Sequence, residues 1–144
     1  MRKCFLDTNF FVYLLDETAL FHKQAVAMFL RLAKDKTVCC ISHQTAEEFL
    51  FIFAKLLKLK EEKNIIDQLS KAVDRIFSIP GLSIISPRHE NESVYQVLAV
   101  MGKYQIKPAD AYIIVTIIEN KVSSLATFDE QLQRVAREND IEVF

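Results

Sequence analysis

The sequence predicts an α/β fold in which helices cover both faces of a parallel sheet. Short apolar segments rich in β-branched residues alternate with longer segments whose apolar residues recur at helical spacing. The chain contains only 2 glycines and 3 prolines, which disfavours an all-β fold with many tight turns. Its 144 residues are 51% hydrophobic and 26% charged, which suits one globular domain spanning residues 1–144.

The first predicted strand covers residues 2–6 (RKCFL), a short apolar run that ends at Asp7. A short helix is expected over residues 9–15, with Asp7 or Asn9 as its N-cap. A longer helix is expected over residues 18–34, because its apolar residues recur at every third or fourth position.

The second predicted strand covers residues 37–41 (TVCCI), which are rich in β-branched residues and cysteine. Helical periodicity returns after Ser42 and extends to Leu57. Another helix is expected over residues 60–77, and the turn signal at Pro80 and Gly81 ends it.

The rest of the chain repeats the alternation of strand and helix. Pro108 suits the first position of a helix, where its missing N–H and fixed φ cost nothing. The expected elements are strand 82–85, helix 92–104, helix 108–119, strand 122–126, helix 129–138 and a closing edge strand 141–144.

Charge and cysteine content exclude several classes of protein. The 18 basic and 19 acidic residues give a net charge of −1, which excludes a strongly basic, histone-like nucleic-acid binder. Adjacent cysteines at Cys39 and Cys40 indicate small buried side chains on opposite faces of a strand, not a disulfide framework or a zinc site. Because there is neither a signal peptide nor an apolar run near ~20 residues, we expect a cytoplasmic protein without membrane contact.

Acidic residues follow the predicted strands, at the edge where parallel sheets bind their ligands. Asp7 follows the first strand, Asp129 follows the fourth, and Glu47 and Glu48 lie one turn into the helix after the second. Asp110 lies in the first turn of a helix that we expect to start at the same edge. Carboxylates this close repel one another unless a cation binds among them, and oxygen ligands favour Mg²⁺ or Mn²⁺.

Each acid also has a purely structural interpretation. Asp7 can cap the helix that follows it. Thr45 with Glu48, and Thr127 with Glu130, match the spacing of a capping box. An acid in a first helical turn also suits the positive end of the helix dipole. Taken singly, these interpretations are favoured; taken as a set at one edge of a sheet, a metal site is favoured.

Four short motifs resemble, in order, those of the PIN domain family, and within it the VapC-like toxins of prokaryotic toxin–antitoxin pairs. They are DTN at residues 7–9, SHQTAEE at residues 42–48, PADAYII at residues 108–114 and LATFD at residues 125–129. In the family's second motif the acid stands six places after the serine, which selects Glu48 over Glu47. The resemblance covers nearly the whole chain.

The resemblance implies a PIN-like three-layer α/β/α sandwich with a mostly parallel sheet of four to five strands. It also implies a metal-dependent endoribonuclease in which one or two Mg²⁺ or Mn²⁺ ions activate water for attack on an RNA phosphodiester. The implied ligands are Asp7, Glu48, Asp110 and Asp129. Thr8, Asn9 and Thr127 would hold these carboxylates or a water, although Asn9 could instead be only a cap.

The predicted RNA substrate agrees with the charge once four acids belong to a metal site, since 18 basic residues then face 19 − 4 = 15 acidic ones. Arg134 and Arg137 are the better candidates for phosphate contacts. The lysine-rich segment at residues 55–75 is more simply a solvated helical face.

Phe51 and Ile52 give their helix a second apolar face, which either packs within the domain or binds another chain. The resemblance implies a homodimer and an antitoxin as partners. Two other functions stay open: a PIN nuclease of RNA processing or DNA repair, and a non-catalytic module that binds RNA or protein.

Overall fold

The computed structural model describes residues 1–144 and contains one sheet of five parallel strands. The strand order is β3-β2-β1-β4-β5. The predicted parallel sheet is therefore confirmed, and the C-terminal edge strand belongs to it. The strands are β1 (Lys3–Leu6), β2 (Val38–Ser42), β3 (Ser83–Ile85), β4 (Ser124–Ala126) and β5 (Glu142–Val143).

Seven helices connect the strands, and capping chemistry sets where several of them begin. Ser42 is the N-cap of α3, since its hydroxyl accepts a hydrogen bond from the backbone N–H of Thr45 at 3.0 Å. Pro108 stands at the start of α6, as its fixed φ predicts. The helices are α1 (Thr8–Leu15), α2 (His22–Lys34), α3 (His43–Leu59), α4 (Ile65–Phe77), α5 (Glu90–Tyr104), α6 (Pro108–Glu119) and α7 (Glu130–Glu138).

Two helices begin later than the periodicity predicts. The carboxylate of Asp16, at the end of α1, accepts hydrogen bonds from the backbone N–H and the hydroxyl of Thr18, and a turn precedes α2. Glu61 and Asn64 have φ angles of 55° and 56°, a left-handed conformation through which an α-helix does not continue. Residues 60–64 therefore separate α3 from α4 and are not helical.

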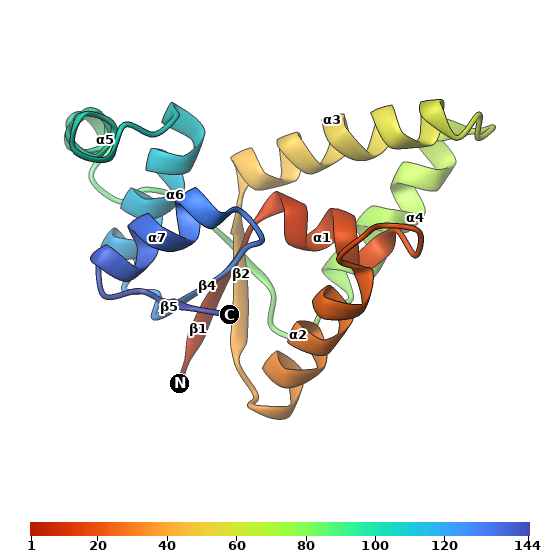
Figure 1. Cartoon of the computed structure of the whole chain (residues 1–144), viewed down its shortest axis with the longest axis horizontal. Helices are drawn as coiled ribbons and strands as arrows, with labels where there is room; N and C mark the ends of the chain where they lie inside the picture. The colour runs from red at the N-terminus through yellow and green to blue at the C-terminus, as the bar shows by residue number, and fades with distance from the viewer.

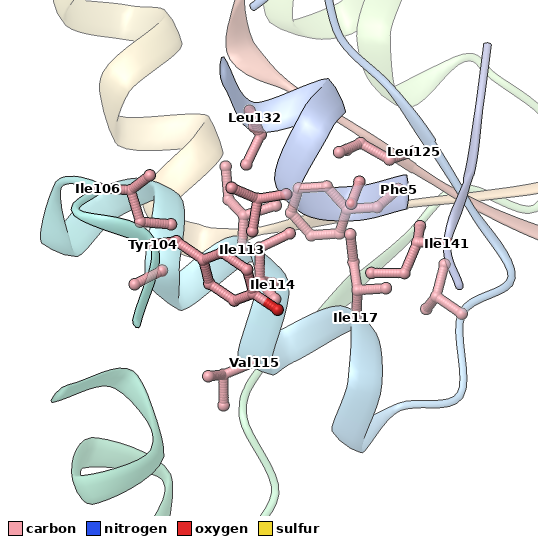
Figure 2. Close-up of a cluster of buried hydrophobic side chains, with 14 of the residues drawn as sticks. Phe5, Tyr104, Ile106, Ile113, Ile114, Val115, Ile117, Leu125, Leu132 and Ile141 are labelled. Carbon is pink, nitrogen blue, oxygen red and sulfur yellow. The ribbon is translucent and has the colours of Figure 1, made fainter. Parts of the chain in front are cut away.

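Side chains along the strands alternate between two apolar cores, one on each face of the sheet. Phe5 and Leu125 face α5, α6 and α7, and Figure 2 shows them packed with Ile114 of α6. Cys40 belongs to this core, whereas Cys39 belongs to the core under α1, α2, α3 and α4. The two cysteines thus lie on opposite faces, as predicted.

The arrangement of layers brings several helix N-termini to one edge of the sheet. Figure 1 shows α5, α6 and α7 on one side of the strands and α1 and α2 on the other, which is the expected α/β/α sandwich. α1 begins where β1 ends, and α3 begins where β2 ends. No helix is long and apolar enough to cross a lipid bilayer.

Candidate metal centre at the carboxyl end of the sheet

Asp7 stands at the centre of this edge, at the end of β1, and is only 6% exposed. Its carboxylate accepts hydrogen bonds from the backbone N–H of Thr8 and the hydroxyl of Thr127, both at 2.7 Å. Asp7 therefore is the N-cap of α1, and Asn9 is not. Burial raises the pKa of Asp7 to about 6; the two hydrogen bonds oppose this rise, and the charges of Glu48 and Asp110 add to it.

Three polar residues, Thr8, Asn9 and Thr127, form a hydrogen-bond network with the carboxylates and the loop after β4. The hydroxyl of Thr127 also accepts hydrogen bonds from the backbone N–H of Asp129 at 3.1 Å and from Nδ2 of Asn9 at 3.3 Å. Oδ1 of Asn9 accepts a hydrogen bond from the backbone N–H of Phe128 at 3.1 Å, which ties α1 to the loop after β4. The hydroxyl of Thr8 donates to Oε2 of Glu48 at 3.0 Å. Thr8 and Thr127 thus each donate a hydrogen bond to one of the four carboxylates, and Asn9 contacts Thr127.

Glu48 approaches this network from α3. Because Ser42 is the N-cap of α3, Thr45 lies inside the helix, and the capping-box interpretation of Glu48 is wrong. Both acids of the pair are exposed, but only Glu48 contacts Thr8 and adds to the rise in the pKa of Asp7, whereas Glu47 makes no hydrogen bond or ion pair.

Asp110 and Asp129 complete the set from α6 and α7. Oδ2 of Asp110 is buried and has no hydrogen-bond partner, the only carboxylate oxygen in the chain in that condition. Burial raises the pKa of Asp110, and the nearby charges of Asp129 and Glu48 add to the rise while Lys107 opposes it. Asp129 is itself the N-cap of α7 and accepts a hydrogen bond from Leu132 N–H at 2.9 Å, so the capping box predicted from Thr127 is wrong.

The donor set fits a hard divalent cation. All four side chains offer oxygen, none of them takes part in any of the ion pairs of the structure, and Asp110 leaves a buried oxygen without a partner. As placed, no three Asp, Glu, His or Cys side chains are close enough to hold one ion together. Glu48 is exposed and Asp110 and Asp129 are partly exposed, so their side chains have room to turn toward an ion while Asp7 stays fixed.

Two further residues of the site escape the motifs. Lys107 directly precedes Pro108, and its positive charge opposes the rise in the pKa of Asp110. Nε2 of Gln133 donates to the backbone carbonyl of Thr127 at 2.8 Å and so braces the loop after β4. The sequence could have indicated Gln133, because it lies one helical turn after Asp129 and therefore near it on the same face of the helix.

The basic candidates lie outside the carboxylate network. Arg134 and Arg137 are exposed on α7, without ion pairs, and neither contacts the four acids. In the lysine-rich segment, Lys60 pairs with Asp16 at 2.7 Å and Lys71 pairs with Asp67 at 2.9 Å. These pairs favour the solvated-face interpretation of that segment.

Comparison with known proteins relates this chain to a protein family and to several solved structures. The PIN domain family model matches residues 4–138. VapBC2 from Rickettsia felis, in a structure bound to a promoter DNA fragment, superposes with a TM-score of 0.66 at 16% identity, over 99% of this chain and 97% of that chain. FitAcB from Neisseria gonorrhoeae superposes with a TM-score of 0.67 at 23% identity, over 98% and 96%. VapC20 from Mycobacterium tuberculosis, a sarcin-ricin loop cleaving toxin, superposes with a TM-score of 0.66 at 15% identity, over 91% and 93%. No curated protein matches the chain by sequence.

Proposed function

The chain belongs to the PIN domain family, and on that premise we propose that it is a metal-dependent endoribonuclease that acts as the toxin of a toxin–antitoxin pair. One observation carries the nuclease proposal. Four carboxylates from distant parts of the chain lie near enough at one edge of the sheet to raise the pKa values of Asp7 and Asp110, and a buried oxygen of Asp110 has no protein partner. Such a group costs free energy unless a ligand satisfies it, and oxygen ligands call for Mg²⁺ or Mn²⁺.

Each residue has a distinct task in this proposal. Thr8 and Thr127 hold Asp7 in one orientation, and Thr8 also orients Glu48. Asp110 and Asp129 complete the oxygen set. A divalent cation bound there supplies an activated water and neutralises charge on the phosphodiester. Lys107 beside Asp110, with Arg134 and Arg137 on α7, offers positive charge to the RNA phosphates.

The toxin role rests on what the chain resembles. Its structural neighbours include VapBC2, FitAcB and the toxin VapC20, and their likeness to this chain extends over more than nine-tenths of its length. We therefore propose an antitoxin and a second copy of the chain as partners. Phe51 on α3 is 71% exposed and Ile66 on α4 is 78% exposed, whereas Ile52 packs into the core. The exposed apolar side chains support a protein partner on these two helices.

We also propose that the protein acts in the cytoplasm, where RNA is available. Cys4 and Cys39 are register partners on β1 and β2 and belong to the same core, yet both are free thiols. Neighbouring free thiols suit a reducing compartment.

Asp110→Asn tests the nuclease proposal. We expect the variant to lose Mn²⁺ binding in calorimetry and cleavage of single-stranded RNA, while its circular dichroism spectrum stays that of the wild type. Asp74→Asn, which removes an exposed acid of α4, is the matched control and should leave both properties unchanged. Equal cleavage by wild type and Asp110→Asn would reject the proposal. Absence of Mn²⁺ binding at millimolar concentration would favour a non-catalytic module.

Expression in a bacterial host tests the toxin role separately. We expect induced wild type to arrest growth and Asp110→Asn to leave growth normal. RNA cleavage by the purified protein without growth arrest would instead assign it to RNA processing.

A further inference from the structure

A cavity of about 250 Å³ lies at the same edge of the sheet as the carboxylates, and its surface is mostly apolar with a few polar groups. Residues at the carboxyl ends of β2 and β3 form one wall, and α6 forms the other. The side chains that matter here are His43, Gln44, Ser86, Tyr112 and Thr116. None of the proposed metal ligands lines this cavity, so it is a separate subsite along the same edge of the sheet.

The polar side chains of this cavity have no partners within the protein. His43, Gln44, Ser86, Tyr112 and Thr116 make no side-chain hydrogen bond, although Ser42 at the rim is satisfied as the N-cap of α3. Thr116 is the most informative of them, because the residue is only 2% exposed and lines the cavity, while its hydroxyl has no partner within the protein. This hydroxyl is not one of the fully enclosed polar atoms that lack a partner, so it opens into the cavity, where a ligand can reach it.

The chemistry of the lining selects the class of ligand. The cavity is lined by no Asp, Glu, Lys or Arg, so it holds neither a carboxylate for a cation nor a lysine or arginine for a phosphate. It offers instead an aromatic ring from Tyr112, an imidazole from His43, and neutral donors and acceptors from Gln44 and Thr116. Its volume lies below the ~300 Å³ at which pockets for drug-sized ligands begin. A small planar group with polar edges fits this description, and single-stranded RNA presents such groups as unstacked bases.

The cavity also lies at the right place along the substrate. Gln44 precedes Glu48 by one turn of α3, about 6 Å along the helix axis. Asp110 and Tyr112 both lie in the first turns of α6, with side chains about 200° apart around the helix axis, so the cavity and the carboxylate lie on different sides of the same helix end. A strand of RNA with one phosphate at the carboxylates therefore brings a neighbouring nucleotide to the cavity. We propose that this cavity binds one base of the RNA next to the cleaved bond and sets the base preference at that position; the proposal rests on the nuclease function proposed above.

Cleavage of a random-sequence single-stranded RNA pool with Mn²⁺ tests this, with the cleaved ends sequenced. The sequenced ends are aligned at the cleaved bond, so the base preference at each flanking position is measured separately. For wild type we expect a preference of roughly tenfold at one position next to the cut, the order expected for hydrogen bonds to one base edge. Thr116→Val keeps the shape but removes the hydroxyl, and should reduce that preference to about twofold while other positions stay unchanged, the change expected for the loss of one hydrogen bond. Thr116→Ser restores a hydroxyl and should restore the preference.

The outcomes separate this proposal from the nuclease function. A flat base profile in wild type, or a profile that Thr116→Val leaves unchanged, overturns the base subsite while Mn²⁺-dependent cleavage keeps the nuclease function intact. No cleavage by wild type overturns both. If Thr116→Val fails to fold, Gln44→Leu at a half-buried position of α3 tests the same cavity and should flatten the same position. Loss of preference at every position alike would indicate general destabilisation and overturn the assignment.

Discussion

Replacing Asp7 with Asn removes a buried negative charge and preserves the shape of the side chain. At neutral pH we expect Asp7→Asn to raise the free energy of unfolding of the metal-free protein. Burial, together with the charges of Glu48 and Asp110, raises the pKa of Asp7 in the folded protein. Ionising this group therefore opposes folding.

The size of the effect follows from that pKa. Burial raises the pKa of Asp7 to about 6 from an ordinary 3.8. Because the folded value is the higher one, the stability contributed by protonated Asp7 is complete below about pH 4 and is lost as the pH rises through about 6. About two pH units at about 1.4 kcal/mol each correspond to about 3 kcal/mol. Asn does not titrate, so the advantage of Asp7→Asn over wild type should grow by up to this amount between about pH 4 and pH 8.

Urea unfolding followed by circular dichroism, with EDTA present, measures this difference. The other titrating groups occur in both proteins, so the comparison between the two removes most of their contribution. Asp74→Asn removes an exposed charge from α4 and should show no such growth with pH. Adding Mn²⁺ should stabilise wild type and narrow the gap, because the ion binds only the folded carboxylates. An advantage of equal size at both ends of the pH range would refute the reasoning.

The remaining predictions address the supporting network and the core. Glu48→Gln should weaken Mn²⁺ binding and RNA cleavage by about tenfold or more, whereas Glu47→Gln should change neither. Calorimetry measures the Mn²⁺ binding and a cleavage assay measures the activity. Equal losses in the two variants would show that both acids contribute to the site. Thr127→Val should lower the free energy of unfolding by about 1–3 kcal/mol, because it leaves Asp7 and a backbone N–H without their partner; Thr127→Ser should recover most of this in the same denaturant titration. Ile114→Ala, at a fully buried position of the core in Figure 2, should cost about 2–5 kcal/mol, and a loss well below 1 kcal/mol would contradict the packing described.

Most of the fold is predictable because its signals are local. A strand of three to five apolar residues and a helix with apolar residues at every third or fourth position are visible without knowing what they pack against. Pro108 and Ser42 mark helix starts through their own backbone chemistry. The break at residues 60–64 is different, because Glu61 and Asn64 adopt left-handed conformations that their residue types permit but do not demand.

Some residues of the candidate site are predictable from local sequence, and others are not. Asp7 and Asp129 are predictable because each directly follows a strand, and the carboxyl ends of parallel strands share one edge. The choice between Glu48 and Glu47 is not available from periodicity, because α3 has apolar residues almost all round. Contact with Thr8, forty residues away in the chain, is what distinguishes Glu48.

The sequence by itself determined the succession of strands and helices along the chain, the acids that follow the strands, and the opposite orientations of Cys39 and Cys40. These depend on backbone periods of 2 and 3.6 residues, which neighbouring residues set. Only the tertiary structure decided that Thr127 supports Asp7, that an oxygen of Asp110 is buried without a partner, and that Thr116 lines a cavity with the ends of β2 and β3. Those features join segments that are distant in sequence, so they exist only once the sheet has brought its strand ends together.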